Sequence, residues 1–388
     1  MNGLVIFVMA GFAIGIGFVT GSPVPVGIAG VLVAAYIFSL LTSRGHLSRL
    51  SVERETDGQM IEVGASILAR LRIHSQGAVP FRWMLVRDRI PKGVIVDSPT
   101  GRLSFGSGFE SQGFFYKATF PSRGIFDLGP AELSSGDLLA TREVTQVDDH
   151  ALTIVVHPRI VPMVAFRLPS SRPFGDLRAD PKSHEDPTRP SGCRPYAYGD
   201  PMKRIHWPAT ARTGALLSRL YDGSSSPVTA VIVDQSTDSY PDEASFELAC
   251  CVAASILACL LRDGAEAGLV GPGLKADSGD LHLERCLASL AGLTLSFQSF
   301  ADQLLQFREE LPWRPSLIVV TSKIDERGAA ALEIIRSAGG TIALAAVGAD
   351  DEIAQQSMGL VVALGGSVMR IRKEVELESG RFISANER

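Results

Sequence analysis

Three oxygen-bearing side chains occur at alternate positions directly after an apolar run. The run Val228–Val233 is typical of a buried strand, and Asp234, Ser236 and Asp238 follow it. Carboxylate and hydroxyl oxygens are ligands for Mg²⁺, and open α/β sheets place ligands at the carboxyl ends of their strands. The spacing predicts either a magnesium site or a carboxylate that caps the next helix and holds its own loop by hydrogen bonds, and we favour the second.

A lysine follows another apolar run of the same region. Lys323 comes two residues after the run Leu317–Thr321, where a further metal-binding carboxylate would be expected. Its ammonium group would repel a divalent cation, or replace it as the ion-pair partner of Asp234. Ser322–Asp325 imitates the guanine-reading motif of GTPases, but the chain has no Gly-x-x-x-x-Gly-Lys-Ser/Thr loop. Serine-hydrolase elbows and His-x-x-x-His zinc pairs are also absent from the sequence.

The segment before the acidic loop, residues 192–219, combines arginine and lysine with tyrosine and tryptophan. Such side chains stack on aromatic faces and pair with carboxylates, so the segment is predicted to dock a partner or to lock onto its own domain. Asp200 with Pro201 is predicted to start a short helix, with the aspartate as its cap. The residues assigned to docking are Arg194, Tyr196, Gly199, Asp200, Arg204, Trp207 and Arg212.

Residues 228–388 are predicted to form an α/β, Rossmann-like domain, because strand-like and helix-like runs alternate there. The predicted strands are Val228–Val233, Ala267–Val270, Leu293–Phe297, Leu317–Thr321 and Thr341–Ala346. The predicted helices are Asp242–Arg262, Leu281–Leu290, Ala301–Glu310 and Glu326–Ala338. A parallel sheet of this kind would bring the Asp234 loop and Lys323 to the same edge.

Two further regions precede that domain. Residues 51–162 carry short alternating runs separated by turn residues, which predicts an immunoglobulin-like β-sandwich. The predicted strands there include Ser66–Ile73, Phe81–Val86 and Phe114–Phe120. Residues 163–227 are rich in proline and arginine and are predicted to be an extended connection that includes the segment 192–219.

Residues 1–43 contain no acidic, basic or histidine side chain. Glycine and proline at positions 21–25 divide this block into 4–20 and 24–42, which predicts two membrane-spanning helices in a hairpin. A cleaved signal peptide is the alternative, but it would need positive charge before the apolar run. Arg44, Arg49 and Arg54 follow the second span and predict that both termini face the cytoplasm, in a bacterial plasma membrane.

The composition excludes some classes of function. The 388 residues carry a net charge of −5, so no global basic field favours nucleic acid as a partner. Three of the five cysteines, Cys250, Cys251 and Cys259, lie in one apolar helical run, and no Cys-x-x-Cys pair is present. We therefore expect reduced, buried thiols and no zinc or redox centre.

The run from Arg194 to Leu216 resembles the signature of a bacterial family called domain of unknown function 58. Its Arg-Pro-Tyr, Gly-Asp, Arg-Ile-His-Trp and Thr-Ala-Arg elements occur in order just before a strand like that of von Willebrand factor A domains. Arg123-Gly124, Asp137 and His157-Pro-Arg add to the resemblance. It also extends to the metal-ion-dependent adhesion site of such domains, from which Asp238 and Lys323 depart.

The resemblance implies a cytoplasmic partner, a MoxR-type AAA+ ATPase, and also a transglutaminase-like membrane protein, but no established activity. We therefore expect a membrane-anchored adaptor in envelope or complex-assembly functions. A magnesium-dependent enzyme that acts on an envelope precursor through Asp234, Ser236 and Asp238 is the alternative. Binding of an anionic ligand or a nucleic acid through Arg204 and Arg212 is a third hypothesis, which predicts a steep dependence on salt.

Overall fold

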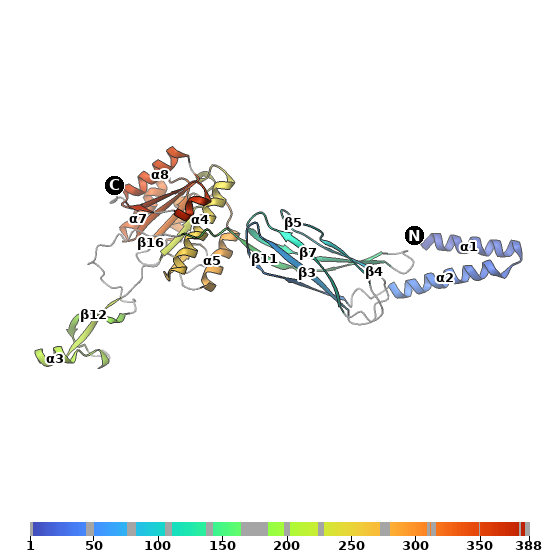
Figure 1. The fold of residues 1–388 in the computed structure, drawn as a ribbon, viewed down its shortest axis with the longest axis horizontal. Helices are drawn as coiled ribbons and strands as arrows, with labels where there is room; N and C mark the ends of the chain where they lie inside the picture. The colour runs from blue at the N-terminus through green and yellow to red at the C-terminus, as the bar shows by residue number, and fades with distance from the viewer. Residues whose placement is uncertain are drawn as a thin grey trace. The chain divides into compact units, whose positions relative to one another are not determined.

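The computed structural model describes residues 3–43, 50–75, 83–104, 111–136, 143–163, 185–197, 202–223, 229–271, 280–308, 311, 316–348, 350–379 and 382–384. The chain forms two compact units. The first contains residues 1–159 and 287–293, and the second contains residues 160–286 and 294–388. The elements of each unit are described separately (Figure 1).

Two apolar helices, α1 (Gly3–Thr20) and α2 (Pro23–Ser43), lie side by side and are joined by a tight turn at Gly21 (Figure 1). The two helices can approach each other closely because small side chains lie between them, such as the buried Ala10 and Ala29. A Cβ atom on Gly17 would lie 2.7 Å from Val26 Cγ2, so only glycine fits there without a shift of its neighbour.

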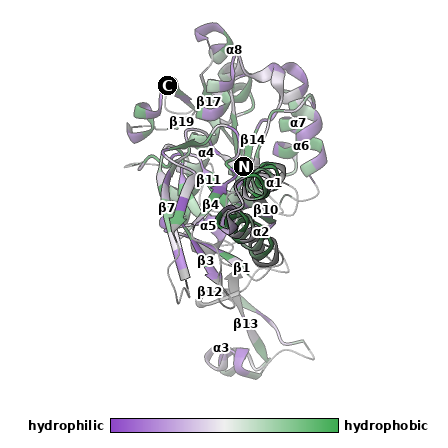
Figure 2. Ribbon diagram, turned by 90° about the vertical axis from the view of Figure 1, so that its right-hand side faces the viewer, coloured by the Kyte–Doolittle hydropathy of each residue, from purple (hydrophilic) through white to green (hydrophobic). Residues whose placement is uncertain are grey.

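The outward surface of this helical pair is apolar along its length (Figure 2). Its most exposed large side chains include Phe12, Phe18 and Val19. Over the part of the chain that the structure describes, the helix that meets the length and hydropathy of a membrane span is α4 (Glu243–Arg262), and 72% of its apolar window is buried. Val5–Thr20 and Pro23–Phe38 are shorter apolar helices by the same measure. Membrane insertion of α1 and α2 therefore stays a prediction.

Eleven strands follow in the first unit and form three sheets of orders β1-β3-β7-β5, β10-β9-β4-β6 and β2-β11-β8. Their bounds are β1 (Leu50–Thr56), β2 (Met60–Glu62), β3 (Ser66–Ser75), β4 (Trp83–Asp88), β5 (Ile95–Val96), β6 (Thr100–Ser104), β7 (Ser111–Thr119), β8 (Gly124–Leu128), β9 (Ala131–Gly136), β10 (Glu143–Asp148) and β11 (Leu152–His157). Alternate residues of these strands, such as Leu71, Met84 and Ile154, face one shared core. The immunoglobulin-like comparison stays a prediction.

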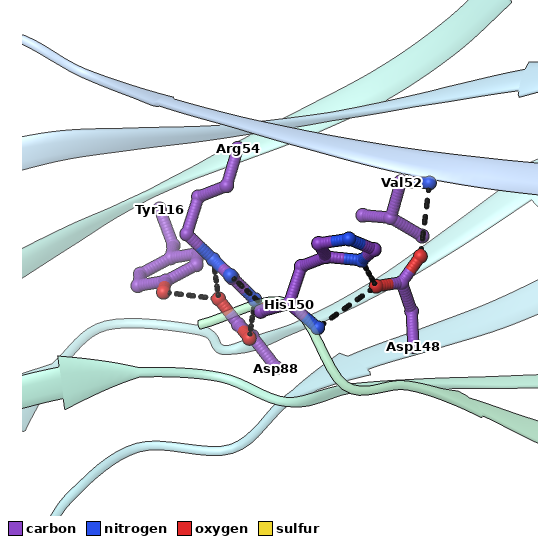
Figure 3. Close-up of polar contacts among 6 residues, drawn as sticks. All are labelled: Val52, Arg54, Asp88, Tyr116, Asp148 and His150. Atoms are coloured by element: carbon purple, nitrogen blue, oxygen red, sulfur yellow. Dashed lines mark hydrogen bonds and ion pairs between the residues drawn. The ribbon is translucent and has the colours of Figure 1, made fainter. Parts of the chain in front are cut away.

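A polar cluster lies inside this β unit (Figure 3). Arg54 of β1 donates to both carboxylate oxygens of Asp88, at 3.1 Å from Nε to Oδ2 and 2.5 Å from Nη2 to Oδ1. Tyr116 of β7 donates to the same carboxylate at 2.6 Å, and Arg54 Nη1 donates to the His150 carbonyl. Burial and the Asp88 charge raise the pKa of Tyr116. Arg54, which the sequence offered as a membrane-flanking charge, is thus a buried structural residue.

The second unit is built on a six-stranded sheet of order β15-β14-β16-β17-β18-β19. Its strands are β14 (Thr229–Val233), β15 (Ala267–Leu269), β16 (Ser316–Thr321), β17 (Thr341–Val347), β18 (Ser367–Ile371) and β19 (Ile383–Ser384). The first five pair in parallel, and β19 is antiparallel to β18. The strands are buried on both sides, as a parallel sheet with two covered faces requires.

Helices cover the two faces of this sheet (Figure 1). They are α4, α5 (Asp280–Gly292), α6 (Phe300–Phe307), α7 (Glu326–Ser337) and α8 (Asp351–Ala363). Phe300 of α6, Leu332 of α7 and Val361 of α8 share one core with alternate strand residues such as Ile232 and Val319. This alternation matches the predicted parallel α/β pattern, and the von Willebrand A-like comparison stays a prediction.

Two predicted segments differ from the structure. Leu293–Phe297 is not a strand, because Ser296 alone forms a bridge to Ser236 and the chain then turns toward α6. The predicted extended connection, residues 163–227, contains ordered elements: β12 (Glu185–Pro195), α3 (Trp207–Thr213) and β13 (Leu217–Gly223). Backbone pairing between β12 and β13 supplies the order that the proline-rich composition concealed.

Candidate functional site

The basic and aromatic segment folds as a small unit of its own, here called the aromatic hairpin, residues 185–197 and 202–223. β12 pairs antiparallel with β13, with Arg194 opposite Ser218 and Pro195 opposite Leu217. Ile205 forms a second antiparallel bridge to Ser218, and the His206 N–H donates to the Leu217 carbonyl at 2.8 Å. β13 is therefore held by backbone pairing from two other segments of the hairpin.

The helix α3 of the aromatic hairpin is fixed at both ends. His206 caps its start, because the Ala209 N–H donates to His206 Nδ1 at 3.0 Å. Gly214 ends it with φ of 72°, a left-handed conformation that glycine adopts without strain, and its N–H donates to the Thr210 carbonyl. Thr210 also accepts a hydrogen bond from the Leu217 N–H, at 3.1 Å, which ties α3 to β13.

The short helix predicted to start at Asp200 corresponds to a 3₁₀ turn, and its predicted cap stays a prediction. Asp200 and Gly199 lie outside the described residues, and α3 begins after His206 and not after Asp200. A 3₁₀ turn, Met202–Arg204, occupies the position where the sequence predicted the helix. The neutral imidazole of a histidine can accept a hydrogen bond from a helix N–H, although Ser, Thr, Asp and Asn are the usual caps.

The structure brings five of the predicted docking residues together in the aromatic hairpin. Trp207 at the first turn of α3 has 61% of its surface exposed, and Arg212 in the last turn is exposed too. Arg194, Tyr196 and Arg204 are half-buried. Two exposed apolar side chains were missed by sequence reasoning, Met202 (71%) and Leu216 (48%). Neither side chain could be recognised from the sequence, because single apolar residues beside turns carry no periodic pattern.

The acidic loop follows β14 at the carboxyl end of the sheet. The Asp234 side chain is fully buried, and its Oδ1 accepts the Ser236 N–H at 2.8 Å. Its Oδ2 accepts the Thr321 hydroxyl at 2.7 Å. The Tyr240 hydroxyl donates to the Asp234 carbonyl. The carboxylate thus holds its own loop and joins it to β16, as predicted, but it does not cap the following helix: Asp242 caps α4 by accepting the Ser245 N–H.

Burial raises the pKa of Asp234, because a charged carboxylate loses its hydration there. Hydrogen bonds from Ser239, Ser236 and Thr321 oppose this effect, and the nearby charge of Asp325 adds to it. Lys323 does not form the predicted ion pair with Asp234: its side chain is exposed, and only its backbone contacts Thr321. Asp325 instead caps α7 by accepting the Gly328 N–H at 2.7 Å.

The three predicted metal ligands differ in their surroundings. Asp234 and Ser236 are buried, whereas Asp238 is exposed in the 3₁₀ turn Thr237–Ser239. Within the described ranges, no group of three or more His, Cys, Asp or Glu side chains is arranged to hold a metal ion. The described residues therefore assign no reaction step to magnesium.

An exposed aromatic side chain stands beside this loop. Ser296 donates its N–H to the Gln235 carbonyl at 2.7 Å and accepts the Thr237 N–H at 3.0 Å. The next residue, Phe297, has 99% of its surface exposed. The exposure of Phe297 could not be predicted from the sequence, because Phe297 ends the run Leu293–Phe297, which was predicted to be a buried strand.

Residues 192–361 match one family profile. The family is described as "Protein of unknown function DUF58". The matched range begins in β12 and ends in α8, so it covers most of the aromatic hairpin and the sheet as far as β17. The chain is also 24% identical over 298 residues to "Uncharacterized protein YeaD" of Bacillus subtilis (strain 168), and the alignment covers 72% of each protein.

Three solved structures match this chain with low TM-scores. A crystal structure of BslA, a bacterial hydrophobin, gives a TM-score of 0.17 at 12% identity over 26% of this chain and 96% of that one. A conjugative transposon lipoprotein from Bacteroides eggerthii DSM 20697 gives 0.18 at 14% identity, over 26% and 95%. Cwp6 from Clostridium difficile gives 0.18 at 9% identity, over 83% and 49%. Scores of this size support no statement about fold or function.

Proposed function

We propose that this chain is a membrane-anchored adaptor that binds a cytoplasmic protein through the aromatic hairpin. The observation that carries the proposal is Trp207, a large aromatic side chain that a well-fixed helix holds 61% exposed. Tryptophan and arginine are enriched among the residues that contribute most to protein interfaces, and Arg212 lies on the same helix.

The helical pair supports the anchoring part of the proposal. At about 1.5 Å per residue, the 18 residues of α1 and the 21 residues of α2 are about 27 Å and 32 Å long. The hydrocarbon core of a bilayer is about 30 Å thick. Apolar side chains such as Phe12 of α1 and Val31 of α2 are exposed, where water would be an unfavourable environment and lipid a favourable one.

The partner that we propose is a MoxR-type AAA+ ATPase, and a transglutaminase-like membrane protein would belong to the same assembly. The basis is the signature around Arg194–Leu216, whose resemblance to the DUF58 family implies such partners, together with the family match over residues 192–361. A role in the bacterial envelope and a cytoplasmic orientation follow from the same resemblance and from the arginines after α2.

The test uses the full chain in lipid nanodiscs and a purified MoxR-type AAA+ ATPase from the same organism. Calorimetry with and without ATP should show binding that Trp207→Ala weakens by about tenfold or more, because a buried aromatic anchor would be lost. Phe115→Ala is the matched control, since Phe115 is a similarly exposed aromatic side chain (67%) on β7. Absence of binding by the unaltered chain in both nucleotide states would refute the ATPase adaptor.

A further inference from the structure

The aromatic hairpin concentrates positive charge in a chain that is negative overall. Over residues 185–197 and 202–223 the sequence has six basic side chains, Arg189, Arg194, Lys203, Arg204, Arg212 and Arg219, and three acidic ones, Glu185, Asp186 and Asp222. The whole chain has a net charge of −5. Positive charge is thus separated from the rest of the chain and placed on the same small unit as Trp207.

Two of these cations, Lys203 and Arg212, form no ion pair with the residues that the structure describes. Lys203 and Arg212 are exposed, and among the described residues no carboxylate lies within ion-pair distance of either. By contrast, the half-buried Arg370 and the exposed Arg372 of the second unit both pair with Asp351. Lys203 and Arg212 are therefore available to a binding partner.

The aromatic hairpin also has very little core of its own. Of its residues whose side chains are described, Ile205 and Ser218 are buried. The Arg219 Nε atom is buried without a hydrogen-bond partner in the described part of the chain. An isolated two-stranded ribbon is marginally stable in water, so contact with another surface would add the apolar burial that the hairpin lacks.

We infer that the surface bound by the aromatic hairpin is an acidic protein surface, in which aspartate and glutamate side chains surround an apolar recess for Trp207. Guanidinium groups form paired, directional hydrogen bonds with carboxylates, which fixes the position of Arg212 opposite an acidic side chain. The inference rests on the proposed function, because it names the chemistry of the partner surface at the same site.

A protein surface fits these observations better than a lipid surface does. The hydrogen bonds of His206, Thr210 and Gly214 hold α3 in one orientation, so Trp207 and Arg212 are presented in a fixed relation to each other. Fixed presentation favours a partner with complementary shape, whereas an anionic bilayer attracts cations without any requirement for geometry. Anionic lipid and a second copy of this chain are therefore outcomes that would overturn the inference.

The experiment measures binding of the ATPase to the full chain in nanodiscs as a function of salt. Arg212→Glu and Lys203→Glu should each weaken binding by about tenfold or more at low salt and reduce its salt dependence, because charge attraction becomes repulsion. Lys92→Glu and Arg327→Glu change exposed cations outside the hairpin by the same charge and should bind like the unaltered chain. Arg212→Lys keeps the charge but loses the paired hydrogen bonds, so its binding should fall between that of the unaltered chain and that of Arg212→Glu.

The outcomes separate this inference from the proposed function. If the ATPase binds but Arg212→Glu and Lys203→Glu bind it as well as Lys92→Glu does, the inference of an acidic partner surface is wrong. The proposed adaptor function would still hold. If the ATPase does not bind at all, a photoreactive amino acid at position 207 of the full chain in its native membrane decides the inference. An adduct on an acidic peptide of another protein that Arg212→Glu abolishes supports it, whereas an adduct on lipid, on a second copy, or none overturns it.

Discussion

The Thr321 hydroxyl donates to Asp234 Oδ2 at 2.7 Å, although the two residues are 87 positions apart in the chain. Both side chains are fully buried at the carboxyl ends of adjacent parallel strands, β14 and β16. This bond closes the acidic loop over the sheet. The loop is therefore stabilised by the protein's own donors.

Thr321→Val should lower the free energy of unfolding by about 1–3 kcal/mol, because it leaves a buried acceptor of Asp234 without its donor while preserving the side-chain shape. Chemical unfolding of the full chain in detergent would measure the change. Thr153→Val is the matched control: its hydroxyl donates to Asp127 at the same distance but on an exposed surface, and the expected change is below about 0.5 kcal/mol. Equal effects of the two substitutions would contradict the structural role of the buried bond.

Asp234→Asn should change how stability depends on pH. The folded-state pKa of Asp234 is raised, so the folded protein binds this proton more tightly than the unfolded chain does. The contribution of the group to stability is therefore fully present below the unfolded pKa, about 3.9, and is lost as pH rises through the folded pKa.

The asparagine variant lacks this loss, so its stability relative to the unaltered protein should increase from pH 4 to pH 7. Unfolding curves at several pH values, with Asp127→Asn as an exposed control, would test this. A rise in melting temperature of the unaltered chain with millimolar Mg²⁺, absent in Asp234→Asn, would instead indicate metal binding at the loop.

The regular elements could be predicted where burial imposes a periodic pattern. β14, α4, β16 and α7 lie within a residue or two of their expected bounds, because each has one or two buried faces. The aromatic hairpin could not be predicted, since its order comes from backbone pairing between β12 and β13 and from caps such as His206. Neither backbone pairing nor a histidine cap can be recognised from amino-acid composition.

The candidate site divides in the same way. Docking by Trp207 and Arg212 stays a prediction, whereas the position of Asp234 after a strand followed from the sequence. The hydrogen-bond donor to Asp234 could not be predicted. Thr321 is the last residue of a predicted apolar strand, and only the sheet order brings it beside Asp234. Lys323 was the wrong expectation, because its side chain is exposed and Thr321, at the end of β16, supplies the hydroxyl that donates to the carboxylate.

Asp88→Ala should destabilise the β unit by about 3–5 kcal/mol. It would leave the Arg54 guanidinium buried without its carboxylate, and the Tyr116 hydroxyl would lose its acceptor (Figure 3). Thermal and chemical unfolding would measure the loss. The control is Glu55→Ala, which removes the exposed Arg72–Glu55 pair from the sheet that carries Arg54 and Tyr116. It should cost at most about 1 kcal/mol. A small effect of Asp88→Ala would mean that water or rearrangement solvates Arg54.

Phe12→Arg should prevent stable membrane insertion of α1, if α1 and α2 span the bilayer as proposed. Phe12 is 73% exposed near the middle of α1, and an arginine at the centre of a spanning helix costs about 2.5–3.5 kcal/mol of apparent insertion free energy. The fraction of chain that resists extraction by alkaline carbonate would fall, whereas Phe115→Arg, at an exposed aromatic of β7, would leave it unchanged. If carbonate releases the unaltered chain, or if both variants stay in the membrane, the helical pair does not anchor the protein in the way proposed.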